Sequence, residues 1–159
     1  MQNPSTFPIT HTFPGRLSTM AHPPGDPDLA TALTHLRSQG TDILVSALTP
    51  PEQISLNLTT EPAAARTAGI EFHSLPIPDF GTPDRTEITP TLTHLLDRLR
   101  GGANVVIHCW GGIGRSSLLA ASLLVLDGVE PDEAWRLISE ARGVEVPETD
   151  EQRNWIRFT

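Results

Sequence analysis

Residues 104–116 read NVVIHCWGGIGRS, and this stretch decides the fold class. The apolar run at residues 104–108 predicts a buried strand, and the glycines that follow it predict a tight loop. Residues 116–126 come next and are apolar nearly all round, which predicts a helix buried at the centre of the domain. A strand, a glycine loop and a helix in this order are typical of an α/β domain.

Strands and helices also alternate on both sides of this segment. Apolar residues recur at helical spacing between Asp26-Pro27, interpreted as an N-cap and first turn, and Gly40, a stop signal. Thr49 and Glu52 form a capping box for a short helix. Strands are predicted at residues 16–20, 43–48, 70–75 and 104–108, and further helices at residues 61–68, 89–99, 131–142 and from residue 149.

This order of elements predicts a three-layer α/β domain with a central, mostly parallel sheet of about four to five strands flanked by helices. Residues 1–25 are rich in proline, threonine and histidine, and we interpret them as an N-terminal arm leading into an edge strand at residues 16–20. Residues 26–159 are interpreted as one catalytic domain. A chain of 159 residues with 38% hydrophobic residues is long enough to close such a core.

Composition excludes several classes of protein. The net charge of −8, from 19 acidic and 11 basic residues, argues against a general nucleic-acid binder and a cationic membrane-surface protein. The single cysteine excludes an internal disulfide and a cysteine-rich zinc cluster. The most apolar run, residues 118–126, is half as long as a membrane span, and the first residues carry no secretory signal pattern. We therefore expect a cytoplasmic protein, whose oligomeric state is open.

The glycine loop after the 104–108 strand has the properties of an anion site. Consecutive backbone N–H groups in such a loop point into one concavity, and the N-terminus of the following helix adds partial positive charge. Glycine allows the positive φ values and the close backbone approach that a cradle around a phosphate requires. The planar fork of arginine can bind two phosphate oxygens at once. The expected phosphate-binding residues are Trp110, Gly111, Gly112, Ile113, Gly114 and Arg115.

Cys109 begins this loop and would lie at the bottom of the cradle. The field that holds a phosphate dianion also stabilises a thiolate, so the loop predicts a cysteine nucleophile that needs no adjacent general base. A lone cysteine after a strand is more often a small buried hydrophobic residue, and a glycine run is more often a turn. The phosphate loop of nucleotide hydrolases is excluded, because it needs a lysine and the chain contains none. The spacing from cysteine to arginine also fits a sulfurtransferase poorly.

His108, Cys109, five residues, Arg115 and Ser116 resemble the signature of the cysteine-dependent protein tyrosine phosphatases. Within that superfamily the chain resembles the small dual-specificity type, and most of all the kinase-associated phosphatases (the cyclin-dependent kinase inhibitor 3 family). The resemblance implies the protein tyrosine phosphatase fold and hydrolysis of phosphomonoesters through a phosphocysteine, with no cofactor and no catalytic metal. The alternatives are a catalytically idle phosphopeptide-binding module and a phosphatase of a non-protein phosphomonoester.

A general acid must protonate the leaving oxygen, and the proline-rich loop at residues 75–84 offers Asp79 and Asp84. The resemblance implies Asp79, because small dual-specificity phosphatases place the acid about 30 residues before the cysteine, as here. The resemblance to the kinase-associated phosphatases extends to the sequence Gly-Thr-Pro-Asp that ends this loop. Asp84 is expected to help start a helical turn instead.

The same resemblance implies supporting roles for other residues. His108 would hold Cys109 in place, and Ser116 would donate to the sulfur, although a strand-end histidine and an N-cap serine are equally ordinary interpretations. Gln152 would position the hydrolytic water or act as the capping-box partner of Thr149. Glu148 departs from the pattern, because the related phosphatases have glutamine there. Trp110 is expected to pack beneath the cradle rather than line its rim.

Overall fold

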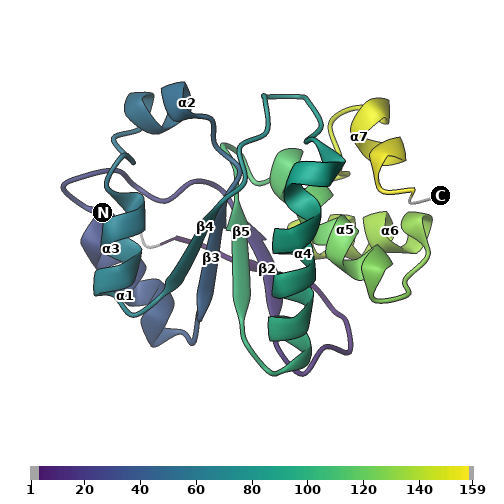
Figure 1. Ribbon diagram of the computed structural model, residues 1–159, viewed down its shortest axis with the longest axis horizontal. Coiled ribbons are helices and arrows are strands. Elements are labelled where there is room, and N and C mark those ends of the chain that lie inside the picture. Colours follow the sequence, from purple (N-terminus) through teal and green to yellow (C-terminus); the bar gives the residue numbers. More distant parts are fainter. Residues whose placement is uncertain (1–3, 158–159) are drawn as a thin grey trace.

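A computed structural model describes residues 4–157, and its centre is a five-stranded sheet with the order β1-β2-β5-β3-β4 (Figure 1). Strands β2, β5, β3 and β4 run parallel to one another, and β1 is antiparallel to its neighbour β2. The prediction of a mostly parallel sheet of four to five strands is confirmed. The strands are β1 (Phe7–Pro8), β2 (Leu17–Met20), β3 (Ile43–Ser46), β4 (Glu71–Ser74) and β5 (Val105–His108).

Helices cover both faces of the sheet, which gives the three expected layers. In Figure 1, α1 and α3 lie on one side of the strands, and α4, α5 and α6 lie on the other. None of the helices in the described part of the chain is long and apolar enough to cross a membrane. The helices are α1 (Leu29–Ser38), α2 (Pro50–Ser55), α3 (Glu61–Thr67), α4 (Arg85–Arg100), α5 (Arg115–Leu126), α6 (Pro131–Arg142) and α7 (Asp150–Trp155).

The core has two parts, one on each face of the sheet, because successive side chains of a strand point to opposite faces. Leu44 and Val106 pack among the leucines of α1, whereas Val45 and Ile107 pack against α4, α5 and α6. Helix α5 is buried from Arg115 to Leu124, as its uniformly apolar sequence predicts. The strands that carry the site are therefore fixed from both sides.

Two expectations about the first 40 residues are wrong. The strand predicted at residues 16–20 exists, but it is internal, because β2 pairs with β5 on one side and with the short edge strand β1 on the other. Asp26-Pro27 does not begin a helix: its peptide bond is cis, and α1 begins at Leu29 with Asp28 as the N-cap. An Asp-Pro pair is typical of turns as well as of helix N-termini, and here it lies in a turn.

The helix expected to open at Thr89-Pro90 begins one turn earlier, at Arg85. Asp84 is its N-cap and accepts a hydrogen bond of 3.0 Å from the backbone N–H of Glu87. Pro90 is the sixth residue of α4 and lacks the N–H that would bond the carbonyl oxygen of residue 86, so the helix continues past it with one backbone hydrogen bond fewer. This capping agrees with the role expected of Asp84, and Asp79 is the other carboxylate of this loop.

Candidate active site

The site lies at the carboxyl ends of the parallel strands, where Cys109 directly follows β5. Its sulfur lies 3.2 Å from the hydroxyl of Ser116, on the first turn of α5, and accepts a hydrogen bond of 3.3 Å from the backbone N–H of Gly112. The cysteine is 3% exposed, and its surroundings consist of donors directed at the sulfur. The sulfur therefore lies within hydrogen-bond reach of both the cradle backbone and the first turn of α5.

Gly112 is required by its surroundings, and Gly114 lies close to the side chains of Glu148 and Gln152. Gly112 has φ of +73°, and a Cβ built on it would lie 2.8 Å from the backbone carbon of Met20 at the end of β2. A Cβ on Gly114 would lie 2.4 Å from a carboxylate oxygen of Glu148. At Gly111 there is more room, since the nearest atom lies 4.0 Å away. The cradle therefore packs directly on the backbone of the neighbouring strand and on the segment before α7.

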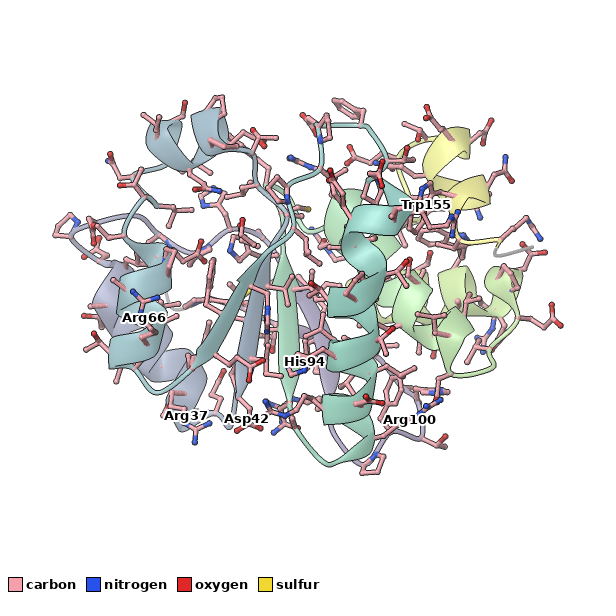
Figure 2. All side chains as sticks on the ribbon, viewed as in Figure 1. Arg37, Asp42, Arg66, His94, Arg100 and Trp155 are labelled. Atoms are coloured by element: carbon pink, nitrogen blue, oxygen red, sulfur yellow. The ribbon has the colours of Figure 1, made fainter. Side chains whose placement is uncertain are left out.

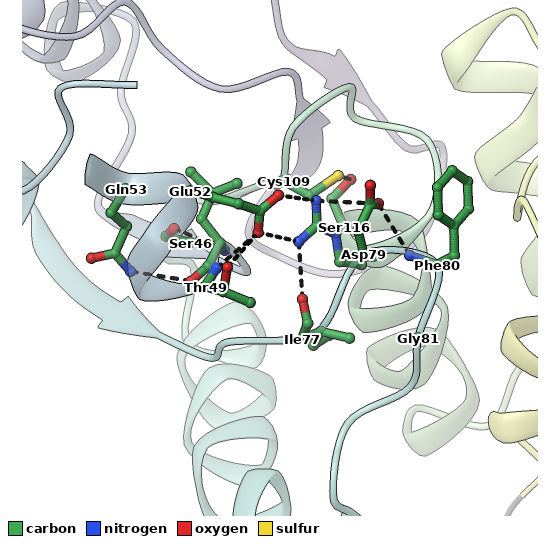
Figure 3. Close-up of polar contacts among 12 residues, drawn as sticks. Ser46, Thr49, Glu52, Gln53, Ile77, Asp79, Phe80, Gly81, Cys109 and Ser116 are labelled. Carbon is green, nitrogen blue, oxygen red and sulfur yellow. Dashed lines mark hydrogen bonds and ion pairs between the residues drawn. The ribbon is translucent and has the colours of Figure 1, made fainter. Parts of the chain in front are cut away.

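Arg115 is the second functional side chain of the loop, and Glu52 of α2 holds its guanidinium by two hydrogen bonds of 2.7 and 2.9 Å (Figure 3). The Nη1 group also donates to the carbonyl oxygen of Ile77, at 2.9 Å. The same Glu52 carboxylate accepts from the backbone and hydroxyl of Thr49, so the capping box of α2 also fixes the catalytic arginine. Sequence analysis identified Glu52 only as a helix cap.

The electrostatics of the Glu52–Arg115 pair keep both groups ionised. The hydrogen bonds from Arg115 lower the pKa of Glu52 to about 2, against the opposing effect of burial. Burial would lower the pKa of Arg115, but the hydrogen bonds and charge of Glu52 raise it above its ordinary value. An arginine has five N–H donors, and among residues 4–157 no acceptor holds Nε–H. The Nε edge of Arg115 is therefore available for phosphate oxygens.

Asp79 lies on the loop that joins β4 to α4, and its carboxylate is 3.4 Å from Nη2 of Arg115 (Figure 3). Its side chain is 54% exposed, which suits a group that meets the leaving oxygen of a substrate. The next residue, Phe80, has φ of +60° and donates its backbone N–H to the Asp79 carboxylate at 3.0 Å. Positive φ is uncommon for a bulky residue, and such strain clusters at functional sites.

His108 points away from the pocket, to the face of the sheet that α3 covers. A hydrogen bond of 2.6 Å joins its Nε2 to Glu61, the first residue of α3, and both side chains are buried. Its Nδ1 lies 3.3 Å from the carbonyl oxygen of Cys109. The histidine thus links α3 to the backbone of the nucleophile. Glu61 is a second residue that sequence analysis did not identify.

Gln152 is buried, and both ends of its amide have protein partners. The amide nitrogen donates to the carbonyl oxygen of Gly81 at 3.1 Å, and the amide oxygen accepts from the backbone N–H of Glu148 at 3.1 Å. Its own backbone N–H donates to Thr149, the N-cap of α7. Gln152 therefore ties the loop that carries Asp79 to the chain before α7.

The pocket at this site has a volume of about 350 Å³ and is lined by Cys109, Arg115 and Asp79 together. Trp110 is 45% exposed and lines this pocket, with its ring edge-on to His22, so the expectation that it packs beneath the cradle is wrong. Phe80 is 56% exposed at the same pocket. The lining residues are Glu52, Asp79, Phe80, Cys109, Trp110, Gly111, Ile113, Arg115 and Glu148.

Arg142, at the end of α6, supports the cradle from outside the pocket. Its guanidinium donates to the carbonyl oxygens of Gly112 and Gly111, at 3.2 and 3.3 Å, and lies 4.3 Å from the centre of the Phe7 ring. These bonds occupy carbonyl groups on the back of the loop, so the loop can direct its N–H groups to the front. This contact could not be predicted from the sequence, because Arg142 lies 30 residues from Gly112.

This fold, with a cysteine and an arginine at the two ends of a backbone cradle, defines a member of the cysteine-dependent protein tyrosine phosphatase superfamily. The model of the cyclin-dependent kinase inhibitor 3 family matches residues 34–135 of the sequence. The chain belongs to the cyclin-dependent kinase inhibitor 3 family.

Individual relatives agree with this assignment. The cyclin-dependent kinase inhibitor 3 of Rattus norvegicus is 38% identical over 90 residues, which are 55% of this chain and 42% of the rat protein. The match thus spans less than half the length of the curated relative. Kinase-associated phosphatase, solved with a serine in place of its catalytic cysteine, has a TM-score of 0.89 at 24% identity and covers 99% of this chain and 94% of its own. Tk-PTP in its active form has a TM-score of 0.70 at 27% identity, and the match covers 87% of this chain and 86% of Tk-PTP.

Proposed function

We propose that this protein is a metal-independent protein tyrosine or dual-specificity phosphatase that acts through a phosphocysteine. The observation that carries the proposal is the contact set of the Cys109 sulfur, which lies between Ser116 and a cradle N–H in one pocket with Arg115 and Asp79. The family assignment supports the same reaction. The proposal includes a cytoplasmic setting, in which a reactive thiol stays reduced.

In the first step the Cys109 thiolate attacks phosphorus, and the S–P bond forms as the ester P–O bond breaks. The backbone N–H groups of residues 110–115 and the Nε edge of Arg115 bind the equatorial oxygens, whose charge they stabilise. Protonated Asp79 gives its proton to the leaving alkoxide or phenoxide. Glu52 keeps the guanidinium in the plane that suits two phosphate oxygens.

In the second step water attacks phosphorus and the S–P bond breaks, which releases phosphate and restores the thiolate. The Asp79 carboxylate accepts the proton of the attacking water. The Ser116 hydroxyl, 3.2 Å from the sulfur, stabilises the thiolate as it leaves. Gln152 is held by Gly81 and Glu148 in this structure, so we assign it to positioning the Asp79 loop rather than the water.

The pocket favours a phosphoprotein over a polyanionic phosphomonoester such as an inositol lipid. Trp110 and Ile113 of the cradle are neutral, and the carboxylates of Glu52 and Glu148 also line the pocket. Further phosphate groups on a substrate would therefore meet negative charge with no added cation. The exposed rings of Trp110 and Phe80 offer apolar contact to an aryl ester such as phosphotyrosine.

Hydrolysis of p-nitrophenyl phosphate in the presence of EDTA tests the proposal. The wild type should turn over, and Cys109→Ser, which keeps the size of the side chain but lacks the thiolate, should be inactive. The wild type should also cleave phosphotyrosine peptides with a higher kcat/KM than phosphothreonine peptides of the same sequence. Asp79→Ala should lower turnover while phosphopeptide stays bound.

The control for the acid is Asp84→Ala, because Asp84 belongs to the same loop and caps α4. Activity that persists in Cys109→Ser, or that is absent from both proteins, would refute the phosphatase proposal. Binding of phosphopeptide by a wild type without turnover would identify the idle binding module instead. A larger loss in Asp84→Ala than in Asp79→Ala, in proteins of equal stability, would refute the assignment of the acid.

A further inference from the structure

A cluster of metal-ligand side chains lies outside the active site, between the edge strand β4 and helix α4. Glu71 and His73 are two residues apart on β4 and so point to the same face of the strand, and His94 reaches them from α4. Figure 2 shows His94 on the side of α4 nearest the strands. We call these three residues, Glu71, His73 and His94, the β4–α4 site.

The donor atoms of the β4–α4 site converge on one point. Nε2 of His73 lies 2.6 Å from Oε2 of Glu71, and Nε2 of His94 lies 2.7 Å from the same oxygen. The ligand atoms of all three side chains lie within 4.8 Å of one another. The side chains are 27–44% exposed, so an ion and its water ligands can reach them from solvent.

The carboxylate of Glu71 is prepared to act as a ligand. Its side chain is 33% exposed, and its Oε2 is the atom that both histidines contact. Arg98 binds Oε1, the oxygen that the histidines do not contact. Carboxylates that bind metals are commonly held in this way through their second oxygen, which fixes their orientation.

We propose that the β4–α4 site binds one divalent transition-metal ion, and that Zn²⁺ is the ion it fits best. Two imidazoles and one carboxylate are a common zinc ligand set, with water as the fourth ligand. Zinc bond lengths place neighbouring ligand atoms of a tetrahedron about 3.3 Å apart, so separations of 2.6–2.7 Å have to widen by less than about 1 Å. Imidazole ligands disfavour Mg²⁺ and Ca²⁺, which take oxygen ligands.

Binding requires no redox step and no co-reactant. Each neutral imidazole presents the Nε2 lone pair to the ion by carrying its proton on Nδ1. The ion would replace the two hydrogen bonds that Nε2 of His73 and Nε2 of His94 make with Oε2 of Glu71. Since β4 and α4 flank the loop that carries Asp79, the ion would link the two elements between which this loop is suspended.

Calorimetric titration of Zn²⁺ into the 159-residue chain tests the inference, in a buffer without phosphate. The background is Cys109→Ser, because the active-site thiolate is itself a zinc ligand. One equivalent should bind, and the affinity should fall at least tenfold in His73→Ala and in His94→Ala. The matched control is His35→Ala on α1, which removes a histidine outside the site and should leave the affinity unchanged.

Two further measurements make the outcome independent of folding defects. Co²⁺ should give the visible absorption of a tetrahedral site in the Cys109→Ser background, and His94→Gln, which keeps a hydrogen-bond donor for Glu71, should lose it. Zn²⁺ should raise the melting temperature of the background and of His35→Ala, and not that of His73→Ala. Equal affinity in all variants, or no binding in the background protein, would overturn the inference, whatever the phosphatase assay shows.

Discussion

Two glutamates on the short helices after β3 hold Arg115 of the phosphate loop and His108 at the end of β5, and the surroundings of the two pairs differ. Glu52 binds Arg115 at the wall of the pocket, where the glutamate side chain is 16% exposed. Glu61 binds His108 behind β5, where the two side chains are 1% and 0% exposed. A pair at the pocket can share its cation with a substrate, whereas a sealed pair can only hold its partner in place. The first pair is therefore open to a substrate in the pocket, and the second belongs to the scaffold.

The largest effect on stability is expected from the sealed pair. Glu61→Ala leaves His108 buried without its partner, which should lower the free energy of unfolding by about 3–5 kcal/mol. Urea denaturation measures the change. Glu61→Gln keeps an oxygen acceptor and should cost less, about 1–2 kcal/mol, so it reports on the pair if the alanine variant does not fold. Stability equal to the wild type in both variants would contradict a structural role for this pair.

The pocket pair should differ, because its loss should lower activity as well as stability. Glu52→Gln removes the charge that fixes the guanidinium of Arg115, and we expect kcat/KM on p-nitrophenyl phosphate to fall about 10–100-fold, or about 1.4–2.7 kcal/mol. Glu148→Gln is the matched control, because it removes another carboxylate from the same pocket without touching Arg115. Equal losses in both variants would show that pocket charge, rather than the hold on Arg115, sets the rate.

Acid should weaken the pocket pair in a defined window. The pKa of Glu52 is about 2 in the folded protein, below its ordinary value of 4.5, so the pair contributes its full stability above about pH 4.5. That contribution, about 2 kcal/mol after allowance for partial exposure, is lost as the pH falls toward 2. Urea denaturation of the wild type and of Glu52→Gln at several pH values should show their difference shrinking in that window. A difference independent of pH would contradict this account.

The parts of the site that are contiguous in sequence could be predicted, and the family resemblance added Asp79, but the contacts of Glu52 and Glu61 could not be predicted. Cys109 and Arg115 share one loop, so their spacing indicates the chemistry. Glu52 lies 63 residues from Arg115, and Glu61 lies 47 residues from His108. The capping box of α2 was visible, but its second use became apparent only when the fold placed α2 beside the loop.

The same reason explains the β4–α4 site. The sequence shows no metal-binding spacing, because Glu71 and His94 are 23 residues apart and meet only when α4 packs beside the edge strand. The errors in the fold have a local cause instead. Asp26-Pro27 and Thr89-Pro90 both read as helix starts, yet the first belongs to a turn, and the cap at Asp84 starts α4 before the second. Tertiary packing decides which of several adjacent start signals is used.

The contact between Gly112 and the end of β2 limits substitution at position 112 but not at the two positions that it meets, Met20 and Ala21. The loop meets the main chain at Met20 and Ala21, so the contact is indifferent to which side chains those two positions carry. Position 112 accepts only hydrogen, because any larger substituent collides with atoms that every residue possesses. The contact thus restricts position 112 to glycine and adds no restriction of its own on the side chains at positions 20 and 21.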